Sequence, residues 1–440
     1  MHYIIFGAVP TEINELGSKI VLAMVLATVF EIAVMVPIMY ASTVLPTKGG
    51  FYVMSSKLIH PWAGISVFLE VMIEPVWLAT FAVLFSDYFC QLVPSLSGHE
   101  LWVSTVLLLI FSILAYRGNY FLASVNSIAV AALIVVIGLY VYMGLTGIDA
   151  NVINIELALS NGIKLNSMAV AINVFSSCLM GASGLSQIAD DIKNPRRNVP
   201  LSIIISTLAV SVVYILICIV TLKYVCNNSI HDLAEVASKF MSPFLVKVFI
   251  ICGPIFGILT SITPTAMSQC SRLHMMAKDR LLPQIFTKEN KYGVPVFCLA
   301  YVMLCAFTLV VSFKSFDTLI AIASAISSLI NVPLCIFPFE INRQFLYASK
   351  HPGIKMNVKF VEITSVIVAV ISTYLALATF KSLGIKVWGI LLLYVLAILL
   401  YIVVRKKFLK AKGIDLMKEL ADPLKEWGER EEVCKELELV

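Results

Sequence analysis

The chain has 440 residues, of which 60% are hydrophobic and 13% charged, and its mean hydropathy is +0.93. A composition this apolar excludes a soluble globular domain and predicts an integral membrane protein. The formal net charge of +5 goes with an uneven distribution of Lys and Arg between alternate loops, so it indicates orientation in a bilayer and not nucleic-acid binding.

Apolar stretches of about 20 residues, the length that one membrane-spanning helix needs, recur along the chain. We count eleven, near residues 20–42, 62–88, 101–116, 121–145, 167–189, 199–225, 244–268, 294–313, 316–339, 360–380 and 385–404. The pattern predicts a membrane domain over 1–410 and a charged, solvated tail over 411–440. Because the loops richer in Lys and Arg should be cytoplasmic, the prediction is a multi-pass protein of the plasma membrane with its C-terminus inside the cell.

The span near 20–42 contains Glu31 at membrane depth. Carboxylates are costly in lipid, and by default they indicate function. A hydrogen bond from Glu31 to a neighbouring helix is an equal alternative, and the sequence leaves both open.

The span near 62–88 contains Glu70 and Glu74, four residues apart and therefore on one helix face. Two such charges in a low dielectric should not both ionise, so one is expected to hold a proton near neutral pH. This is the chemistry that a proton-coupled carrier needs, and it makes the pair a candidate coupling site. The alternative is a pair that faces water near the cytoplasmic mouth, beside a kink at Pro75.

The span near 167–189 is interrupted by the sequence Gly-Ala-Ser-Gly at 181–184. Irregular backbone at membrane depth is tolerated where it lines a cavity, which predicts a broken helix at a binding site. The alternative is that the glycines let helices pack closely. Asn173, Ser176 and Ser177 precede the interruption, and their polar groups suit either a ligand or neighbouring helices.

The span near 244–268 ends in hydroxyl residues around Pro264. Thr263 and Thr265 are weak candidates for sodium, because hydroxyls and a proline-freed carbonyl are hard oxygen ligands. The commoner alternative is a hydroxyl that bonds back to its own helix.

Motifs for other functions are missing. The chain has no GxxxxGK[ST] loop, no HExxH and no GxSxG, and its six histidines are scattered. Its ten cysteines include no CxxC pair, which is typical of apolar packing. We therefore expect neither an enzyme nor a cofactor, and no metal beyond the weak sodium candidates.

Three loop motifs resemble those of one transporter family. The segment from Gly181 through 190–200 (DDIKNPRRNVP) resembles the sixth helix and following loop of amino acid–polyamine–organocation (APC) permeases. Residues 46–52 (PTKGGFY) resemble the loop after helix two, and 277–283 (AKDRLLP) with 292–295 (YGVP) resemble the loop after helix eight. Because the three occur in the family's order, the chain is identified as resembling an APC permease.

The resemblance implies a LeuT-like fold with an inverted repeat of five plus five helices and two further C-terminal helices. It also implies secondary active transport of amino acids or related amines by alternating access, through proton symport or exchange. The expected partners are such a substrate and the lipid bilayer, without nucleic acid, and the oligomeric state stays open.

In the family, the first helix is broken by a glycine turn that precedes an apolar pair and a proline. Here Ile5, Phe6 and Pro10 resemble the end of that pattern, with His2, Tyr3 and Ile4 at the place of the glycines. The resemblance thus implies that the first helix is largely missing, and it favours a late-called start or a truncated gene. The alternative function is a non-transporting amino-acid sensor or a degenerate permease copy.

In this family the substrate lies between the broken first and sixth helices. The positions that match are Ile4, Ile5, Ser177, Gly181, Ala182, Ser183 and Gly184.

Overall fold

The computed structural model describes residues 4–44, 50–117, 120–147, 165–224, 230–345 and 349–421, with the side chains at 50, 58, 120–126, 187–191 and 421 left aside. Within these ranges the backbone is helical apart from loops and one isolated bridge between Glu289 and Pro295. The predicted all-α class is therefore confirmed.

The first half of the chain contributes most of the helices around the candidate site. They are α1 (Ile5–Leu16), η1 (Gly17–Lys19), α2 (Ile20–Val44), α3 (Gly50–Met54), η2 (Ser55–Ile59), α4 (Pro61–Ile73), α5 (Val76–Leu92), η3 (Pro94–Leu96), α6 (Glu100–Tyr116), α7 (Tyr120–Thr146), α9 (Leu165–Leu179) and η4 (Met180–Asp191).

The second half continues with longer spans and with short helices at both ends of the bundle. Its elements are α10 (Pro195–Tyr224), α11 (Leu233–Ala237), α12 (Pro243–Ile250), η5 (Ile251–Ile255), α13 (Phe256–Lys278), η6 (Gln284–Thr287), α14 (Val296–Phe313), α15 (Phe316–Leu334), α16 (Phe337–Gln344), α18 (Val358–Ser382), α19 (Ile385–Ala411) and α20 (Leu416–Ala421).

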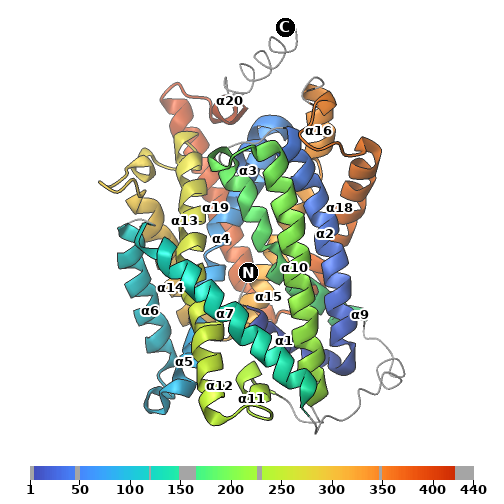
Figure 1. The fold of residues 1–440 in the computed structure, drawn as a ribbon. Helices are drawn as coiled ribbons and strands as arrows, with labels where there is room; N and C mark the ends of the chain where they lie inside the picture. The colour runs from blue at the N-terminus through green and yellow to red at the C-terminus, as the bar shows by residue number, and fades with distance from the viewer. Residues whose placement is uncertain are drawn as a thin grey trace.

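Ten helical stretches of the described residues are long and apolar enough to cross a membrane, and α6 is a shorter apolar helix. Ten of the eleven predicted spans coincide with these stretches, and the span near 101–116 coincides with α6. The chain is therefore a multi-pass membrane protein. The figure shows α3, α16 and α20 at one end of the bundle and α11 and α12 at the other (Figure 1).

The first two helices form a hairpin that starts inside the bundle. The chain begins at mid-height, α1 runs to the end that carries α11 and α12, and α2 returns toward the opposite end (Figure 1). Gly17 sits at the reversal with a φ of 56°, which a residue with a Cβ rarely adopts. Residues Ile4, Ile5 and Phe6 are at most 1% exposed, so the start of α1 is fully packed.

A break divides the span 61–92 into α4 and α5 at Glu74 and Pro75. Such a break leaves backbone carbonyls without their usual helical partner. Here the Met72 carbonyl accepts hydrogen bonds from the hydroxyls of Tyr301 (2.9 Å) and Tyr394 (2.5 Å). The neighbouring helices α14 and α19 thus provide hydrogen-bond donors for the carbonyl freed at the break. Backbone polar groups within a membrane need such partners.

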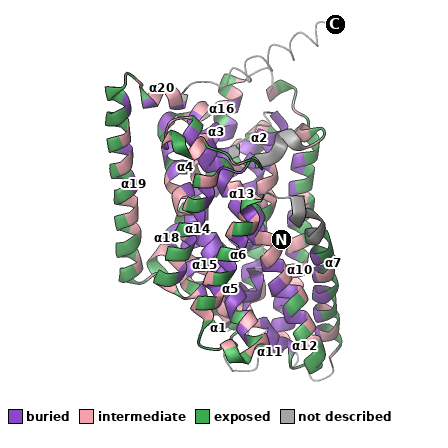
Figure 2. Cartoon of the chain, turned by 90° about the vertical axis from the view of Figure 1, so that its left-hand side faces the viewer, coloured by how far each residue is buried: buried purple, intermediate pink, exposed green. Residues whose placement is uncertain are grey.

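Helix α19 stands at the edge of the bundle with most of its surface exposed (Figure 2). Only Ile398, Ile402 and Leu409 are buried along it. This agrees with the apolar, peripheral character expected of a final span. Its polar residues nevertheless fix it in place, since Tyr401 donates to the Leu281 carbonyl at 3.0 Å.

Candidate functional site

The predicted interruption of the sixth membrane span lies where α9 changes into the 3₁₀ helix η4 at Met180. A 3₁₀ stretch within a span is uncommon and often marks a functional hinge. The backbone therefore tightens here instead of unwinding. Gly181 is exposed, and a Cβ added at Gly184 would meet no atom within 4 Å, so this side of η4 faces open space.

The hydroxyls predicted to face a substrate bond to their own helix. Ser177 donates to the Val174 carbonyl at 2.7 Å, and Ser183 donates to the Met180 carbonyl at 2.8 Å. Ala182 is half-buried, so it offers a small apolar surface beside the glycines. The polar groups available to a ligand at this position are therefore mainly backbone ones.

Ile4 and Ile5 lie at the start of α1, which packs against α9. The Ile4 carbonyl accepts from the backbone N–H groups of Gly7 (3.0 Å) and Ala8 (2.8 Å), so it is already engaged in the first turn. The two helices that the family resemblance singled out are in contact. The predicted binding role of their residues stays a prediction.

The polar residues upstream of the break join helices to one another. Ser176 donates to a carboxylate oxygen of Glu31, and Asn173 donates to the Thr379 hydroxyl at 2.7 Å and accepts from Ser328. Glu31 therefore forms the hydrogen bond to a neighbouring helix that was one of its two predicted roles. The other oxygen, Oε1 of Glu31, is buried and has no partner among the described residues.

The second predicted site, Glu70 and Glu74, lies at the break between α4 and α5. Arg272 from α13 forms an ion pair with Glu74 through Nη2 and Oε1, and their side chains are 6% and 13% exposed. Gln269, almost one turn earlier on α13, donates to the Glu74 backbone carbonyl at 3.2 Å. The two carboxylates therefore lie near a cation, Arg272, which the spacing of the two glutamates does not predict.

Four polar atoms of this cluster have no partner in the part of the chain that the structure describes. They are Glu70 Oε2, Glu74 Oε2, Gln269 Oε1 and Arg272 Nε. Buried polar atoms are normally satisfied by protein, water or ligand. Their gathering at one helix break indicates a place that binds water or solute within the membrane-spanning region.

The charges of the cluster do not balance. Two carboxylates face one guanidinium, which leaves one negative charge in excess when all are ionised, and one bound proton makes the cluster neutral. An uncompensated charge is expensive in a low-dielectric surrounding. The arrangement can therefore take up and release a single proton.

The weak sodium candidates lie in the middle of α13, which continues through Pro264. Thr263 is buried and its hydroxyl has no partner within the described ranges, while Thr265 is half-buried. Their neighbours Thr260 and Ser261 bond back to the Gly257 carbonyl at 2.9 Å, as the alternative interpretation expects. A sodium role for Thr263 and Thr265 stays a prediction.

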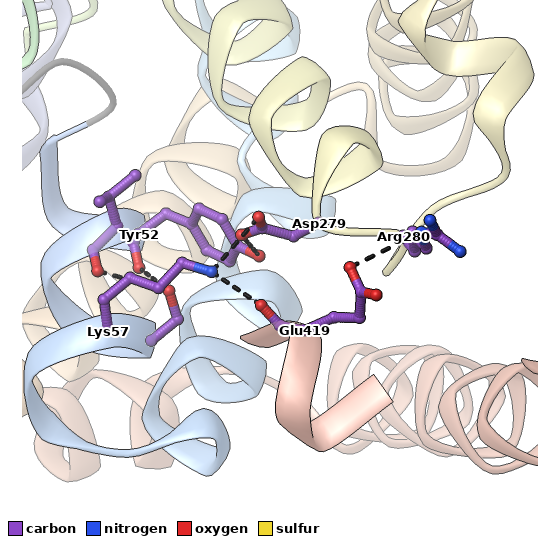
Figure 3. A network of polar contacts seen from close by, with 7 residues as sticks. Tyr52, Lys57, Asp279, Arg280 and Glu419 are labelled. Atoms are coloured by element: carbon purple, nitrogen blue, oxygen red, sulfur yellow. Dashed lines mark hydrogen bonds and ion pairs between the residues drawn. The ribbon is translucent and has the colours of Figure 1, made fainter. Parts of the chain in front are cut away.

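A further polar network closes the end that carries α20 (Figure 3). Lys57 donates to the Glu419 backbone carbonyl at 2.8 Å and lies 3.4 Å from Asp279, which also accepts from Tyr52 at 2.8 Å. Burial raises the pKa of Asp279, an effect that Lys57 opposes. Arg280 pairs with the Glu419 carboxylate at 3.6 Å.

The described part of the tail is therefore not a freely solvated helix as expected. Leu416 and Leu420 are at most 1% exposed and pack on the bundle. The tail beyond residue 421, the loop at 46–49 and the side chains of Asp190 and Asp191 lie outside the described residues.

Sequence reasoning missed the role of Arg272 and Gln269. The signal was present, because an arginine inside a long apolar segment calls for a buried counter-charge. Glu70 and Glu74 were the obvious candidates, but only the packing of α13 against α4 and α5 identifies the partner.

Comparison with known proteins agrees with this architecture. The family model described as "Amino acid permease" matches residues 3–404. Relatives include a cationic amino acid transporter of Arabidopsis thaliana (26% identical, covering 54% of this chain and 46% of the relative) and a methylthioribose transporter of Bacillus subtilis (25%, 57% and 57%). A glutamate/serine transporter of Bacillus subtilis is 25% identical over 58% of this chain and 50% of its own.

The chain spans about half to two thirds of the length of the curated relatives it matches. The matched family and the named relatives are transporters and not enzymes. Because the family model covers nearly all of the membrane-spanning helices, the chain belongs to the amino acid permease family of the APC superfamily.

Proposed function

We propose that this chain is a secondary transporter that moves amino acids or related amines by alternating access and couples their movement to a proton. The observation that carries the proposal is the buried cluster of Glu70, Glu74 and Arg272 at the break between α4 and α5. The cluster has one excess negative charge, unpartnered polar atoms and a position inside a membrane span. Intramembrane carboxylates of this kind mark ion and proton pathways.

Two relatives support the substrate class, since their names describe transporters of cationic amino acids and of glutamate and serine. The change from α9 to η4 next to α1 supports a site between these helices, because broken helices hold substrates near the bilayer midplane in transporters. Ile4, Ile5, Ser177 and residues 181–184 are its proposed lining.

The proposed location is the plasma membrane, with α3, α16 and α20 on the cytoplasmic side. The end that carries these helices includes Lys57, Arg280 and Arg343, and the positive-inside rule favours this orientation. The alternative function is a sensor or degenerate copy that binds an amino acid without transporting it.

The experiment is uptake of a panel of labelled amino acids into proteoliposomes, with and without an imposed pH gradient. Glu70→Gln is the informative coupling variant, because it removes the excess charge and leaves the Glu74–Arg272 ion pair in place. It should abolish the response to the gradient while substrate exchange persists. Glu289→Gln, at a half-exposed position at the α20 end, is the matched control and should respond normally.

A second arm tests the lining. Gly181→Leu should fill the space beside η4 and stop uptake. Gly389→Leu on exposed α19, where a Cβ meets nothing within 4 Å, is its control. Uptake that survives Gly181→Leu would refute the proposed lining, and binding without any uptake would favour the sensor.

A further inference from the structure

Four lysines lie close together at the end of α19. Lys406, Lys407 and Lys410 belong to the last two turns of the helix, and Lys412 is the residue that caps it. All four are exposed, and no ion pair among the described residues involves any of them. Like charges at this spacing repel one another, so an anion that binds between them is favoured.

The helix dipole accounts for only part of this lysine cluster. Cations are favoured near the C-terminus of a helix, but the effect falls off within the last turn. Lys410 and Lys412 lie within that range, whereas Lys406 and Lys407 lie a turn earlier. The cluster therefore needs another partner for its positive charge.

Arg405 and Tyr401 fix the other side of the helix to the bundle. The Arg405 guanidinium donates to the Leu282 carbonyl at 2.9 Å, and the Tyr401 hydroxyl donates to the Leu281 carbonyl at 3.0 Å. Because each residue turns a helix by about 100°, the three helical lysines are turned about 100–200° away from Arg405. They therefore face away from the protein, in agreement with their exposure.

The lysines continue the outward apolar face of α19, which lies at the edge of the bundle (Figure 2). Val403 and Leu400 precede Lys407 by four and seven residues, so they share its side of the helix. They are 51% and 64% exposed. Apolar side chains this exposed on a membrane-spanning helix are stable against the acyl chains of lipid. The ammonium groups therefore lie directly beyond a lipid-covered surface.

The depth of the lysines matches that of phospholipid head groups. Trp388, whose indole donates to the Phe380 carbonyl at 2.8 Å, lies near the start of α19 and marks the opposite interface, where tryptophan is enriched. From residue 388 to 406 the helix advances 18 residues, or about 27 Å, close to the hydrocarbon thickness of about 30 Å. Lys406 therefore lies at the boundary, and Lys410, about 6 Å further along the axis, lies among the head groups.

We propose that the end of α19 binds the phosphodiester head groups of anionic phospholipids through Lys406, Lys407 and Lys410. Lysine ammonium groups bind phosphate as point charges, and clusters of about four to eight basic residues directly beyond a membrane span are typical of anionic-lipid sites. Phe408 is 50% exposed, and its ring centroid lies 4.5 Å from the Lys412 ammonium. An aromatic ring among cations is common where a helix meets the membrane interface.

The test measures lipid binding to the purified full-length chain in neutral detergent. The probes are phosphatidylglycerol and phosphatidylcholine that carry the same fluorescent acyl chain, and the unmodified chain should prefer phosphatidylglycerol. Lys406→Gln combined with Lys410→Gln should weaken phosphatidylglycerol binding by about thirty-fold, the equivalent of about 1 kcal/mol for each lysine. Phosphatidylcholine binding should not change. Lys406→Arg combined with Lys410→Arg keeps the charge and should keep the preference.

The matched control is Lys288→Gln combined with Lys291→Gln, which removes the same charge from exposed positions of the loop after α13. It should leave the preference unchanged, and an equal loss in both glutamine pairs would overturn the site in favour of a general charge effect. Equal binding of the two lipids by the unmodified chain, or loss of the preference in the arginine pair, would also refute the inference.

A final arm separates lipid from free phosphate. Inorganic phosphate should displace labelled phosphatidylglycerol no better than chloride does at matched ionic strength. Stronger displacement by phosphate would indicate a site for the free ion and overturn the lipid assignment. Because no substrate enters these measurements, their failure would leave the proposed transport function standing.

Discussion

The ion pair between Glu74 and Arg272 allows a quantitative test of the central cluster. Because both side chains are less than 15% exposed, the pair should not behave like a surface salt bridge worth about 0–1 kcal/mol. Removal of one partner from a buried pair leaves an uncompensated charge and costs about 3–5 kcal/mol. We therefore expect Arg272→Gln and Glu74→Gln each to lower the free energy of unfolding by that order.

The two single variants should differ in a definite direction. Arg272→Gln leaves two carboxylates, Glu70 and Glu74, without their cation. Glu74→Gln leaves Arg272 with Glu70 still close enough to act on it electrostatically. Arg272→Gln should therefore be the costlier change, and the double variant should cost less than the sum of the two by about 1–3 kcal/mol.

The assay is equilibrium unfolding in mixed detergent micelles, followed by the fluorescence of the five tryptophans. The contact between Gln269 and the Glu74 carbonyl involves the backbone, so it persists in every variant and cancels in the comparison. Single-variant costs below about 1 kcal/mol that simply add in the double variant would refute the assignment, since that is the behaviour of a solvated pair.

Three further predictions follow from individual contacts. Gly64→Ala should destabilise the fold by about 1–3 kcal/mol, measured in the same unfolding assay, because the new Cβ would lie 2.5 Å from Ser56 Cβ and 3.0 Å from its Cα. Tyr301→Phe and Tyr394→Phe should each cost about 0.5–1.5 kcal/mol, and their effects should be coupled, because the two hydroxyls share the Met72 carbonyl and also lie 2.9 Å from each other; strict additivity would contradict this. Since burial raises the pKa of Asp279, its contribution to stability is present below its ordinary pKa and is lost as the pH rises through the raised one. The unfolding midpoint of Asp279→Asn should therefore depend less on pH in that interval, and an unchanged pH profile would count against it.

The network around Asp279 joins segments that lie far apart in the sequence. It joins α3 and η2 to the end of α13 and to α20 through the side chains of Tyr52, Lys57 and Arg280 (Figure 3). The α3–η2 segment and α20 come from opposite ends of the sequence. Any rearrangement that separates α13 from the α3–η2 segment has to break these contacts, so the network stabilises the packing of this end of the bundle.

Much of the membrane architecture was predictable because its causes are local. A run of about 20 apolar residues needs a span wherever it occurs, and proline and glycine interrupt helices through their own backbone chemistry. The break at Pro75 and the change of helix type at Met180 are both near the positions that these residues indicate. The packing of residues 416–420 against the bundle was not predictable, because the sequence of a charged tail does not indicate which surface will bury its few leucines.

The sequence by itself thus determined the apolar spans, the helix breaks and the presence of charges at membrane depth. The tertiary structure decided which charges meet. Arg272 reaches Glu74 across 198 residues, and Ser176 reaches Glu31 across 145. The reason is physical, because a buried charge requires a partner but accepts one from any helix that packing brings within reach.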